Sequence, residues 1–548
     1  MLQNVLSNSR KKRCNGPSLH LIVRGLKEVF MDQAIESGQS LSVRANWIKW
    51  IVLTLVSLVA GYAIVLMYAQ NETIFALLTL VIVASGVVVF AREDTYSHRY
   101  IYPGVAAMVV FIIFPLMYTI GIAFTNYSGT NQLTFERVQT QFLAKTYDQP
   151  NSAYQFELFK IDDNKIQLHF EKQGQYYSTG EINLNSTQEI ALTPSEEISV
   201  GTKAPIRFII QNRDALGKLN ITSYEGHKLT MSGLRQFSAS SPLYELQDDQ
   251  STLVSQLDGE VLKPNMDVGF YQAVNANGEF VGDGISPGFV VSNGWDNFTR
   301  IFLDKGIQGP FIQIFIWTVI FAGLTVLFTL AVGLVLASLV QWDELKGKAI
   351  YRMLLILPYA VPAFISILIF KGLFNQSFGE INQLLEGLFN FKVDWFTDPY
   401  MAKTMILIVN TWLGYPYIMI LCMGLLKSIP SDLYEASAID GAGPIDNFFK
   451  ITLPLMIKPL TPLLIASFAF NFNNFVLIQL LTNGAPDIIG SSTPAGHTDL
   501  LVSYTYRIAF EGGGGQDFGL ASAIATLIFI VVGALALLNL RVSKKQQA

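Results

Sequence analysis

The sequence predicts an α-helical polytopic membrane protein with one β-rich insert domain, and three observations lead to this fold class. Of the 548 residues, 51% are hydrophobic and only 14% are charged, which is a low charge content for a soluble protein. Eight apolar stretches are long enough to cross a bilayer as helices. A long polar segment, 125–310, separates the third stretch from the fourth and alternates in places with the period of a strand.

The first 46 residues are polar, with one basic cluster at Arg10, Lys11, Lys12 and Arg13. No long apolar core follows this cluster before Trp47, so we expect a cytoplasmic tail rather than a cleavable signal peptide. Met31 is an alternative start, because the chain from there keeps every apolar stretch. Residues 1–30 are therefore treated as a possible non-native extension.

The apolar stretches fall into two groups around the polar segment. Three lie within 47–124 and five within 311–541, with a short tail at 542–548; they are 47–69, 73–91, 101–124, 311–341, 350–374, 402–428, 454–482 and 519–540. Lysine and arginine cluster in the N-terminal tail, in alternate loops and in the C-terminal tail. Since cytoplasmic loops are enriched in these residues, we expect both termini in the cytoplasm and the 125–310 domain outside.

The 125–310 segment is of ordinary domain size and begins with a hairpin pattern. Phe156 and Leu158 alternate along one strand, Ile166 to Phe170 along the next, and 162–164 forms the turn. Further strands are expected at 176–177, 182–184 and 206–210. Trp295 to Asp304 is expected to form a helix on the outer membrane surface, with aromatic side chains at headgroup level.

Several kinds of chemistry have no residues to support them. Cys14 lies in the basic tail and Cys422 in an apolar stretch, so neither a disulfide framework nor a cysteine metal site is expected. The sequence contains no P-loop, HExxH or GxSxG motif. We therefore expect a non-catalytic protein with no metal site and no cofactor of its own.

Polar side chains on two apolar stretches indicate a path for a substrate. Ser467, Asn471 and Asn474 recur at i, i+4 and i+7, and so do Asn410, Gly414 and Tyr417, which places each set on one helix face. Together they offer amide, hydroxyl and aromatic groups without charge, which suits a neutral polyhydroxylated molecule. The alternative is that these groups bond one helix to another.

The apolar stretches hold almost no ionisable residues away from their ends. A proton- or sodium-coupled carrier usually has carboxylates or discontinuous helices at the bilayer midplane. We expect neither here, and infer that the energy for transport comes from a partner.

The loop 431–456 is the most distinctive segment of the chain. A helix is expected to begin at Ser431 and to end at Gly441, and a second short helix to begin at Pro444 and to stop at Pro454. Small residues would let a partner approach the backbone, and Glu435 offers it a charge. The loop is not basic, so DNA binding is not expected; an ordinary connector is the plain alternative.

This loop resembles the EAA loop of ABC-importer permeases. The resemblance rests on Glu435-Ala436-Ser437, Gly441 after three residues, and 451–454 after nine more; Ser437 stands where the family prefers alanine. In that family the loop is a coupling helix that docks on a cytoplasmic ATPase. The role carries over to these positions: Glu435, Ala436, Ser437, Asp440 and Gly441.

A wider resemblance, over about 350–540, is to the larger permease subunits of maltose/maltodextrin ABC importers, which also have eight spans and a large insert. It implies the fold of a type I importer permease in a bacterial inner membrane. It implies a second permease subunit, an ATPase homodimer that binds ATP and Mg, and an immunoglobulin-like insert that contacts a periplasmic maltose-binding protein. It places the maltose site at Asn410, Gly414, Tyr417, Ser467, Phe470, Asn471 and Asn474.

Three other functions stay open on the sequence. A permease for a different oligosaccharide would keep the same architecture. An ATP-independent secondary transporter or channel would need no ATPase. A membrane-anchored receptor or enzyme would have its active part in 125–310. In each case the chain contacts membrane lipid and no nucleic acid is expected.

Overall fold

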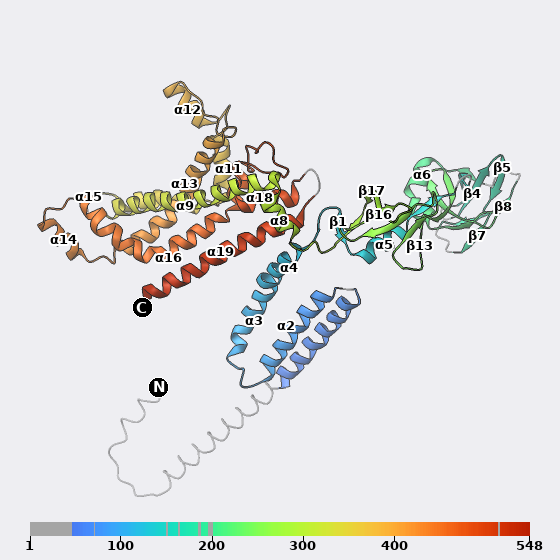
Figure 1. Cartoon of the computed structure of the whole chain (residues 1–548), viewed down its shortest axis with the longest axis horizontal. Helices are drawn as coiled ribbons and strands as arrows, with labels where there is room; N and C mark the ends of the chain where they lie inside the picture. The colour runs from blue at the N-terminus through green and yellow to red at the C-terminus, as the bar shows by residue number, and fades with distance from the viewer. Residues whose placement is uncertain are drawn as a thin grey trace, which may run out of the picture. The chain divides into compact units, whose positions relative to one another are not determined.

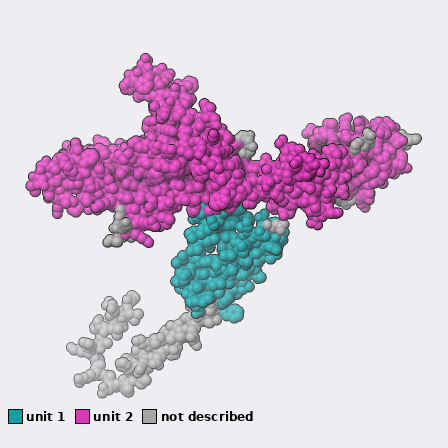
Figure 2. Space-filling view, viewed as in Figure 1, with its two compact units in different colours: residues 1–118 teal, residues 119–548 magenta. Residues whose placement is uncertain are grey.

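The computed structural model describes residues 47–548 except 71, 150–151, 163–164, 185–187, 196–200, 343, 513–515 and 548. The N-terminal tail with its basic cluster therefore lies outside the described residues, as do two residues of the predicted 162–164 turn. Two compact units are present, Met1–Tyr118 and Thr119–Ala548 (Figure 2).

The first unit is built of apolar helices. These are Trp47–Ala69, α2 (Thr73–Ala91) and α3 (His98–Met108), which continues through a π-helical turn η1 (Val109–Ile113) into α4 (Phe114–Ile122). The boundary between the two units falls within α4, after Tyr118. Most of the side chains of these helices are apolar and either exposed or half-buried, as expected for helices in contact with lipid. The hydroxyls of Thr79 and Ser85 bond to carbonyls of their own helix, so these polar groups need no other partner.

Long helices also dominate the part of the second unit that follows the insert. Among the described residues of the whole chain, seven helices are long and apolar enough to cross a membrane, and a bent pair makes an eighth. This confirms the predicted fold class, a polytopic helical membrane protein with about eight spans. In the second unit α9, α13, α16 and α19 run alongside one another (Figure 1); the elements are α8 (Asp296–Leu303), α9 (Lys305–Gln341), α10 (Lys348–Ala360), α11 (Ala363–Leu373), α12 (Glu380–Phe389), α13 (Pro399–Leu426), α14 (Ser431–Ile439), α15 (Pro444–Asn447), η2 (Phe448–Thr452), α16 (Leu453–Phe472), α17 (Phe475–Leu481), α18 (Leu501–Phe510) and α19 (Phe518–Gln547).

Two predicted spans are not continuous helices. The 350–374 stretch bends by 92° between α10 and α11, where Val361 is extended and Pro362 lacks a backbone N–H. The 454–482 stretch breaks between α16 and α17 at Asn473 and Asn474. The predictions were wrong on continuity because apolar length says nothing about the direction of the chain.

The prediction that Pro454 stops a helix was also wrong. The chain is helical from Pro444 to Phe472, and η2 is a π-helical turn directly before α16. Pro454 sits in the first turn of α16. There its missing N–H costs little, since the preceding turn already departs from the α-helical bonding pattern.

The insert consists of β-sheets with short helices, as predicted. One sheet of 11 strands has Phe156 paired with Phe170 and Leu158 with Leu168, so the predicted hairpin is confirmed. A five-stranded sheet joins β13 to β17 in sequence order, and β1 pairs with β18. The immunoglobulin-like class stays a prediction. The elements are β1 (Asn131–Leu133), α5 (Phe135–Leu143), β2 (Thr146–Asp148), β3 (Tyr154–Lys160), β4 (Lys165–Lys172), β5 (Gln175–Ser178), β6 (Ile182–Asn183), β7 (Glu189–Ala191), β8 (Thr193–Pro194), β9 (Thr202–Lys203), α6 (Ile206–Gln211), α7 (Arg213–Gly217), β10 (Asn220–Thr222), β11 (Lys228–Gly233), β12 (Gln236–Pro242), β13 (Tyr244–Leu246), β14 (Leu253–Ser255), β15 (Val261–Asn265), β16 (Phe270–Val274), β17 (Phe280–Ile285) and β18 (Gly288–Phe289).

The strand predicted at 206–210 is instead the helix α6. Pro205 is its N-cap, and of the apolar side chains only Ile209 is buried, whereas Ile206 and Ile210 are exposed. A short apolar run such as 206–210 is compatible with a strand or with a helix. The burial of Ile209 against the rest of the insert favours the helix.

Polar bonds tie the two ends of the insert together where they meet the helical part. The buried Asn297 on α8 donates through Nδ2 to the carbonyl oxygens of Ala123 (3.0 Å) and Thr125 (2.8 Å). Arg300, one turn later, forms an ion pair of 2.9 Å with Asp517. Asp517 Oδ1 also accepts from the backbone N–H of Leu520, at the start of α19.

Candidate functional site

A cavity of about 1230 Å³ lies among α9, α10, α11, α13, α16 and α17. All of the site residues predicted on two helix faces line it, together with Phe470, which the family resemblance supplied; they are Asn410, Gly414, Tyr417, Ser467, Phe470, Asn471 and Asn474. The structure thus brings one set from α13 and the other from α16 and its C-terminal boundary into the same space.

A chain of amide hydrogen bonds crosses the cavity wall. Asn471 Nδ2 donates to the backbone oxygen of Ser467 (2.8 Å), and Asn471 Oδ1 accepts from Asn410 Nδ2 (2.8 Å). Asn410 Oδ1 in turn accepts from Asn474 Nδ2 (3.3 Å). Asn410 and Asn471 are each only 6% exposed, so these amides are satisfied chiefly by one another.

Aromatic rings form the more open walls of the cavity. Tyr417 stacks on Tyr359 with 6.4 Å between ring centroids and an interplanar angle of 23°. Phe470 is 71% exposed and Tyr417 is 40% exposed. Tyr359 was missed by the sequence analysis; its position between Pro358 and Pro362, two residues that favour a break in a helix, is the signal that could have found it.

Both helix breaks open onto this cavity. Val361 and Pro362 line it at the bend between α10 and α11, and Asn474 caps α17 there, its Oδ1 accepting from the N–H of Leu477. The expectation that no discontinuous helices would occur was therefore wrong. The lining residues of the cavity include no Asp, Glu, Lys, Arg or His, so its polarity comes from amides, hydroxyls and backbone groups.

The loop that carries the predicted coupling residues lies at one end of α13 and α16 (Figure 1). Glu435, Ala436, Asp440 and Gly441 are exposed, whereas Ser437 is half-buried. Gly441 has φ of +79° and follows the end of α14, a backbone conformation that favours glycine. The hydroxyl of Ser437 donates to Asn447 Oδ1, so the serine holds α14 to α15.

Comparison with known proteins assigns the family. Residues 133–294 match the family described as "Maltose transport system permease protein MalF P2 domain", residues 47–94 match the N-terminal transmembrane helices of MalF, and residues 329–544 match the binding-protein-dependent transport system inner membrane component. The maltose/maltodextrin transport system permease protein MalF of Vibrio parahaemolyticus is 62% identical over 92% of this chain and 96% of its own length. MalF of Klebsiella aerogenes is 60% identical over 91% of this chain and 96% of its own length.

The chain belongs to the MalF family. It is a multi-pass permease of a bacterial inner membrane and not an enzyme. Among solved structures, a bacterial ABC transporter involved in the import of the acidic polysaccharide alginate aligns with 46% of this chain and 84% of its own, at 22% identity and a TM-score of 0.40. The family assignment rests on the sequence relatives alone.

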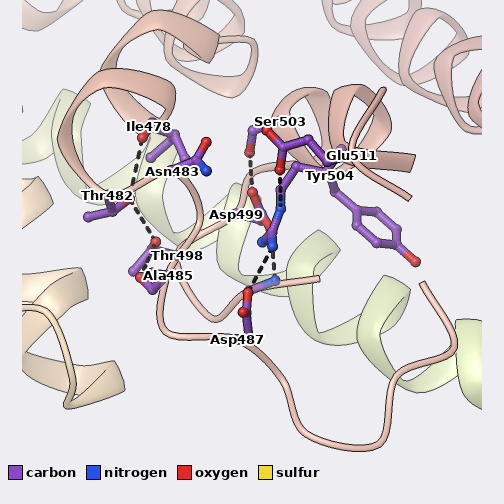
Figure 3. Close-up of polar contacts among 12 residues, drawn as sticks. Ile478, Thr482, Asn483, Ala485, Asp487, Thr498, Asp499, Ser503, Tyr504 and Glu511 are labelled. Atoms are coloured by element: carbon purple, nitrogen blue, oxygen red, sulfur yellow. Dashed lines mark hydrogen bonds and ion pairs between the residues drawn. The ribbon is translucent and has the colours of Figure 1, made fainter. Parts of the chain in front are cut away.

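This MalF-family chain has one buried ion-pair network that the sequence analysis missed. Arg507 bonds Asp499 (2.9 Å), Asp487 (2.8 Å) and Glu511 (3.1 Å) in the segment between α17 and the end of α18 (Figure 3). Asp499 is fully buried and also accepts from Ser503 and from the N–H of Gly496. Burial raises the pKa of Asp499 to about 6, against the opposing effects of Arg507 and the hydrogen bonds.

The same segment is joined to α17, which borders the cavity. Thr498 donates to the hydroxyl of Thr482, directly after α17, and to the carbonyl oxygen of Ala485 (Figure 3). Its charged members all lie within 487–511, and Arg507 and Glu511 are spaced i, i+4, a local signal that the sequence analysis did not use. Within the described residues, no group of three or more His, Cys, Asp or Glu side chains could hold a metal ion.

Proposed function

We propose that the cavity described above is the sugar site of this chain, which is the permease subunit of a maltose/maltodextrin ABC importer. The function follows from the family, whose members compared here bear that description. The observation that supports the site is the convergence of all seven expected residues on one cavity without a formal charge.

The chemistry of the cavity suits a neutral sugar. Amides and hydroxyls exchange their mutual hydrogen bonds for bonds to sugar hydroxyls, and aromatic faces such as Tyr359 and Tyr417 pack on the C–H faces of a pyranose ring. An anionic sugar would lose its hydration without gaining a charged partner, which costs several kcal/mol in a membrane. This favours maltose and maltodextrins over charged oligosaccharides.

The second part of the proposal is that α14 docks on a cytoplasmic ATPase homodimer that binds ATP and Mg. Around the exposed Glu435, the apolar residues Ile439, Ile445 and Phe449 are 88%, 75% and 60% exposed. Exposed apolar side chains beside a charge are typical of a protein contact surface.

The remaining partners follow from the family and the distribution of basic residues. Both termini and α14 lie in the cytoplasm, the 125–310 insert lies in the periplasm, and a periplasmic maltose-binding protein contacts that insert. A second permease subunit covers the side of the cavity on which Phe470 is exposed.

The transport cycle couples these parts. ATP-driven closure of the ATPase dimer moves α14, and the helices turn the cavity outward to receive sugar from the binding protein. Hydrolysis then returns the cavity to the inward side. Movement at α14 reaches the cavity through α13 and α16, which flank the loop and carry Asn410 and Asn471.

Reconstituted complex with maltose-loaded binding protein tests the proposal. The Asn471→Leu variant should keep its assembly and its ATPase activity and lose most uptake of radiolabelled maltose, because it loses an amide that anchors the cavity network. Normal uptake in this variant would remove the site assignment. Stimulation by a binding protein for another sugar, with none by the maltose-loaded protein, would keep the architecture and change the substrate.

A further inference from the structure

Thr325, on α9, joins the cavity's amide network from a third helix. It lines the cavity, is 2% exposed, and its Oγ1 accepts from Asn410 Nδ2 at 3.1 Å. The predicted site drew only on the helices around residues 410 and 471. Asn410 is thus held from α9, from α16 and from the start of α17 at once.

The available hydrogen-bond donors and acceptors determine the orientation of each side-chain amide. The carbonyl oxygen of Ser467 can only accept, so Asn471 must turn its NH₂ group toward it and its Oδ1 toward Asn410. Asn410 must then present its NH₂ group to Asn471. The second hydrogen of that NH₂ group is taken up by Thr325 Oγ1, which leaves Asn410 Oδ1 on the side of Asn474.

The side chain of Thr325 differs from those of its neighbours on the same helix. Thr318 and Thr329 each donate their hydroxyl to the carbonyl oxygen four residues earlier, at 2.7 Å. That is the usual bond of a threonine within a helix. The Oγ1 atom of Thr325 instead accepts a hydrogen bond from Asn410 on α13.

We propose that Thr325 is a positioning residue for the sugar: it fixes the amide of Asn410 so that the cavity presents a defined set of donors and acceptors to sugar hydroxyls. This rests on the proposed function, since it assumes that the cavity holds the sugar. Without Thr325, one amide hydrogen of the buried Asn410 loses its acceptor, and the orientation of the amide is no longer shared by three helices.

Three variants test this inference in the full complex. Thr325→Val keeps the shape of the side chain and removes the hydroxyl, and Thr325→Ser keeps the hydroxyl. Ser338→Ala is the control, because Ser338 lies on the same helix outside the cavity lining and donates its hydroxyl to the carbonyl oxygen of Leu334. The readouts are the Kd of the detergent-solubilised complex for radiolabelled maltose, and maltose transported per ATP hydrolysed in proteoliposomes.

We expect Thr325→Val to weaken maltose binding about tenfold, as the loss of one hydrogen bond within the site implies, and to lower the sugar-to-ATP ratio. Thr325→Ser should restore both values, and Ser338→Ala should leave both unchanged. A merely structural role would lower transport and ATPase activity together and leave their ratio intact, which would overturn the inference.

The failure of this inference differs from the failure of the proposed function. If Asn471→Leu abolishes maltose binding while Thr325→Val has a wild-type Kd, the site stands and the role of Thr325 is wrong. If neither variant changes the Kd, the cavity is not the sugar site.

Discussion

At the residue scale, the chain keeps charge out of its cavity and places it in the ion-pair network of Arg507 instead. The amides of Asn410, Asn471 and Asn474 satisfy one another, so a sugar gains hydrogen bonds only by replacing existing ones. This exchange of hydrogen bonds gives a modest affinity for the sugar. It also makes that affinity depend strongly on the geometry of the sugar hydroxyls, since an amide left without a partner costs about 1–3 kcal/mol. A permease that must release its sugar in every cycle needs this balance.

The buried carboxyl of Asp499 predicts a pH dependence of stability. Its pKa in the folded protein, about 6, lies above its ordinary value near 4. As the pH falls from 7 to 5, the folded state therefore takes up a proton that the unfolded state does not, and the free energy of unfolding rises by about 1 kcal/mol from this group.

Thermal unfolding of the wild type and of Asp499→Asn, at pH 7 and at pH 5, measures this effect. The Tm of the wild type minus the Tm of Asp499→Asn should be larger at pH 5 than at pH 7. Other titrating groups cancel in the comparison. A difference that stays constant between the two pH values would contradict the raised pKa.

At the scale of elements, the packing of α9 against α13 sets the shape of the cavity. A Cβ atom on Gly333 would lie 3.0 Å from Ile418 Cβ and from the backbone nitrogen of Met419. A Cβ atom on Gly414 would lie 2.8 Å from Thr329 Cγ2. Small residues let helices approach closely in a membrane, where no hydrophobic effect drives them together.

Alanine substitutions on α9 should therefore have opposite effects at two glycines. Gly333→Ala forces a contact with the backbone of α13 and should destabilise the protein by about 1 kcal/mol or more. Gly323 is exposed, and its nearest heavy atom would be 4.0 Å away; Gly323→Ala should be neutral or stabilising, because alanine favours the helix. Equal Tm values for the two variants would contradict the close α9–α13 packing.

The elements also show what a sequence can and cannot predict here. Apolar length located the spans, and i, i+4, i+7 spacing located the cavity side chains of α13 and α16, because both patterns are local. Asn474 was assigned to a continuous helix face and instead caps α17, although it still faces Asn410. The contribution of Thr325 depends on a contact between distant segments, which no local pattern records. The bend at Pro362 and the pair of Arg507 with Glu511 had local signals that the sequence analysis did not use.

At the scale of the whole molecule, the proposed function requires the ATPase to act on the cavity through α14. Glu435→Lys should weaken association of the ATPase with the membrane complex, because it reverses the charge at the centre of the exposed loop surface. Membrane insertion should be unaffected, since the loop lies outside the spans. Co-purification of the ATPase and maltose uptake measure the effect.

Glu344→Lys provides the matched control for this charge reversal. Glu344 is exposed in the loop between α9 and α10, which the chain topology places on the same side of the membrane as α14. If Glu344→Lys reduces ATPase association as much as Glu435→Lys does, the effect reports net surface charge and the docking role of α14 is lost.

The insert and the last span are joined through α8, and this connection predicts how a signal from the binding protein reaches the helices. Arg300 lies on α8 near the C-terminal end of the insert and pairs with Asp517, and Asp517 caps the start of α19. Helix α19 in turn packs against α16, which carries Asn471. Arg300→Gln should therefore reduce the stimulation of ATPase activity by maltose-loaded binding protein by about two- to fivefold, the range for a partly buried pair worth roughly 0.5–1 kcal/mol. Basal ATPase activity should not change.

A double-mutant cycle with Asp517→Asn separates this pair from general loss of stability. If the pair transmits the signal, the double variant should be no worse than either single one, because both remove the same interaction. Lys203→Gln, which breaks an exposed pair with Glu157 within the insert, should leave the stimulation unchanged. Additive losses from Arg300→Gln and Asp517→Asn, or an equal loss from Lys203→Gln, would show that docking on the insert reaches the spans by another route.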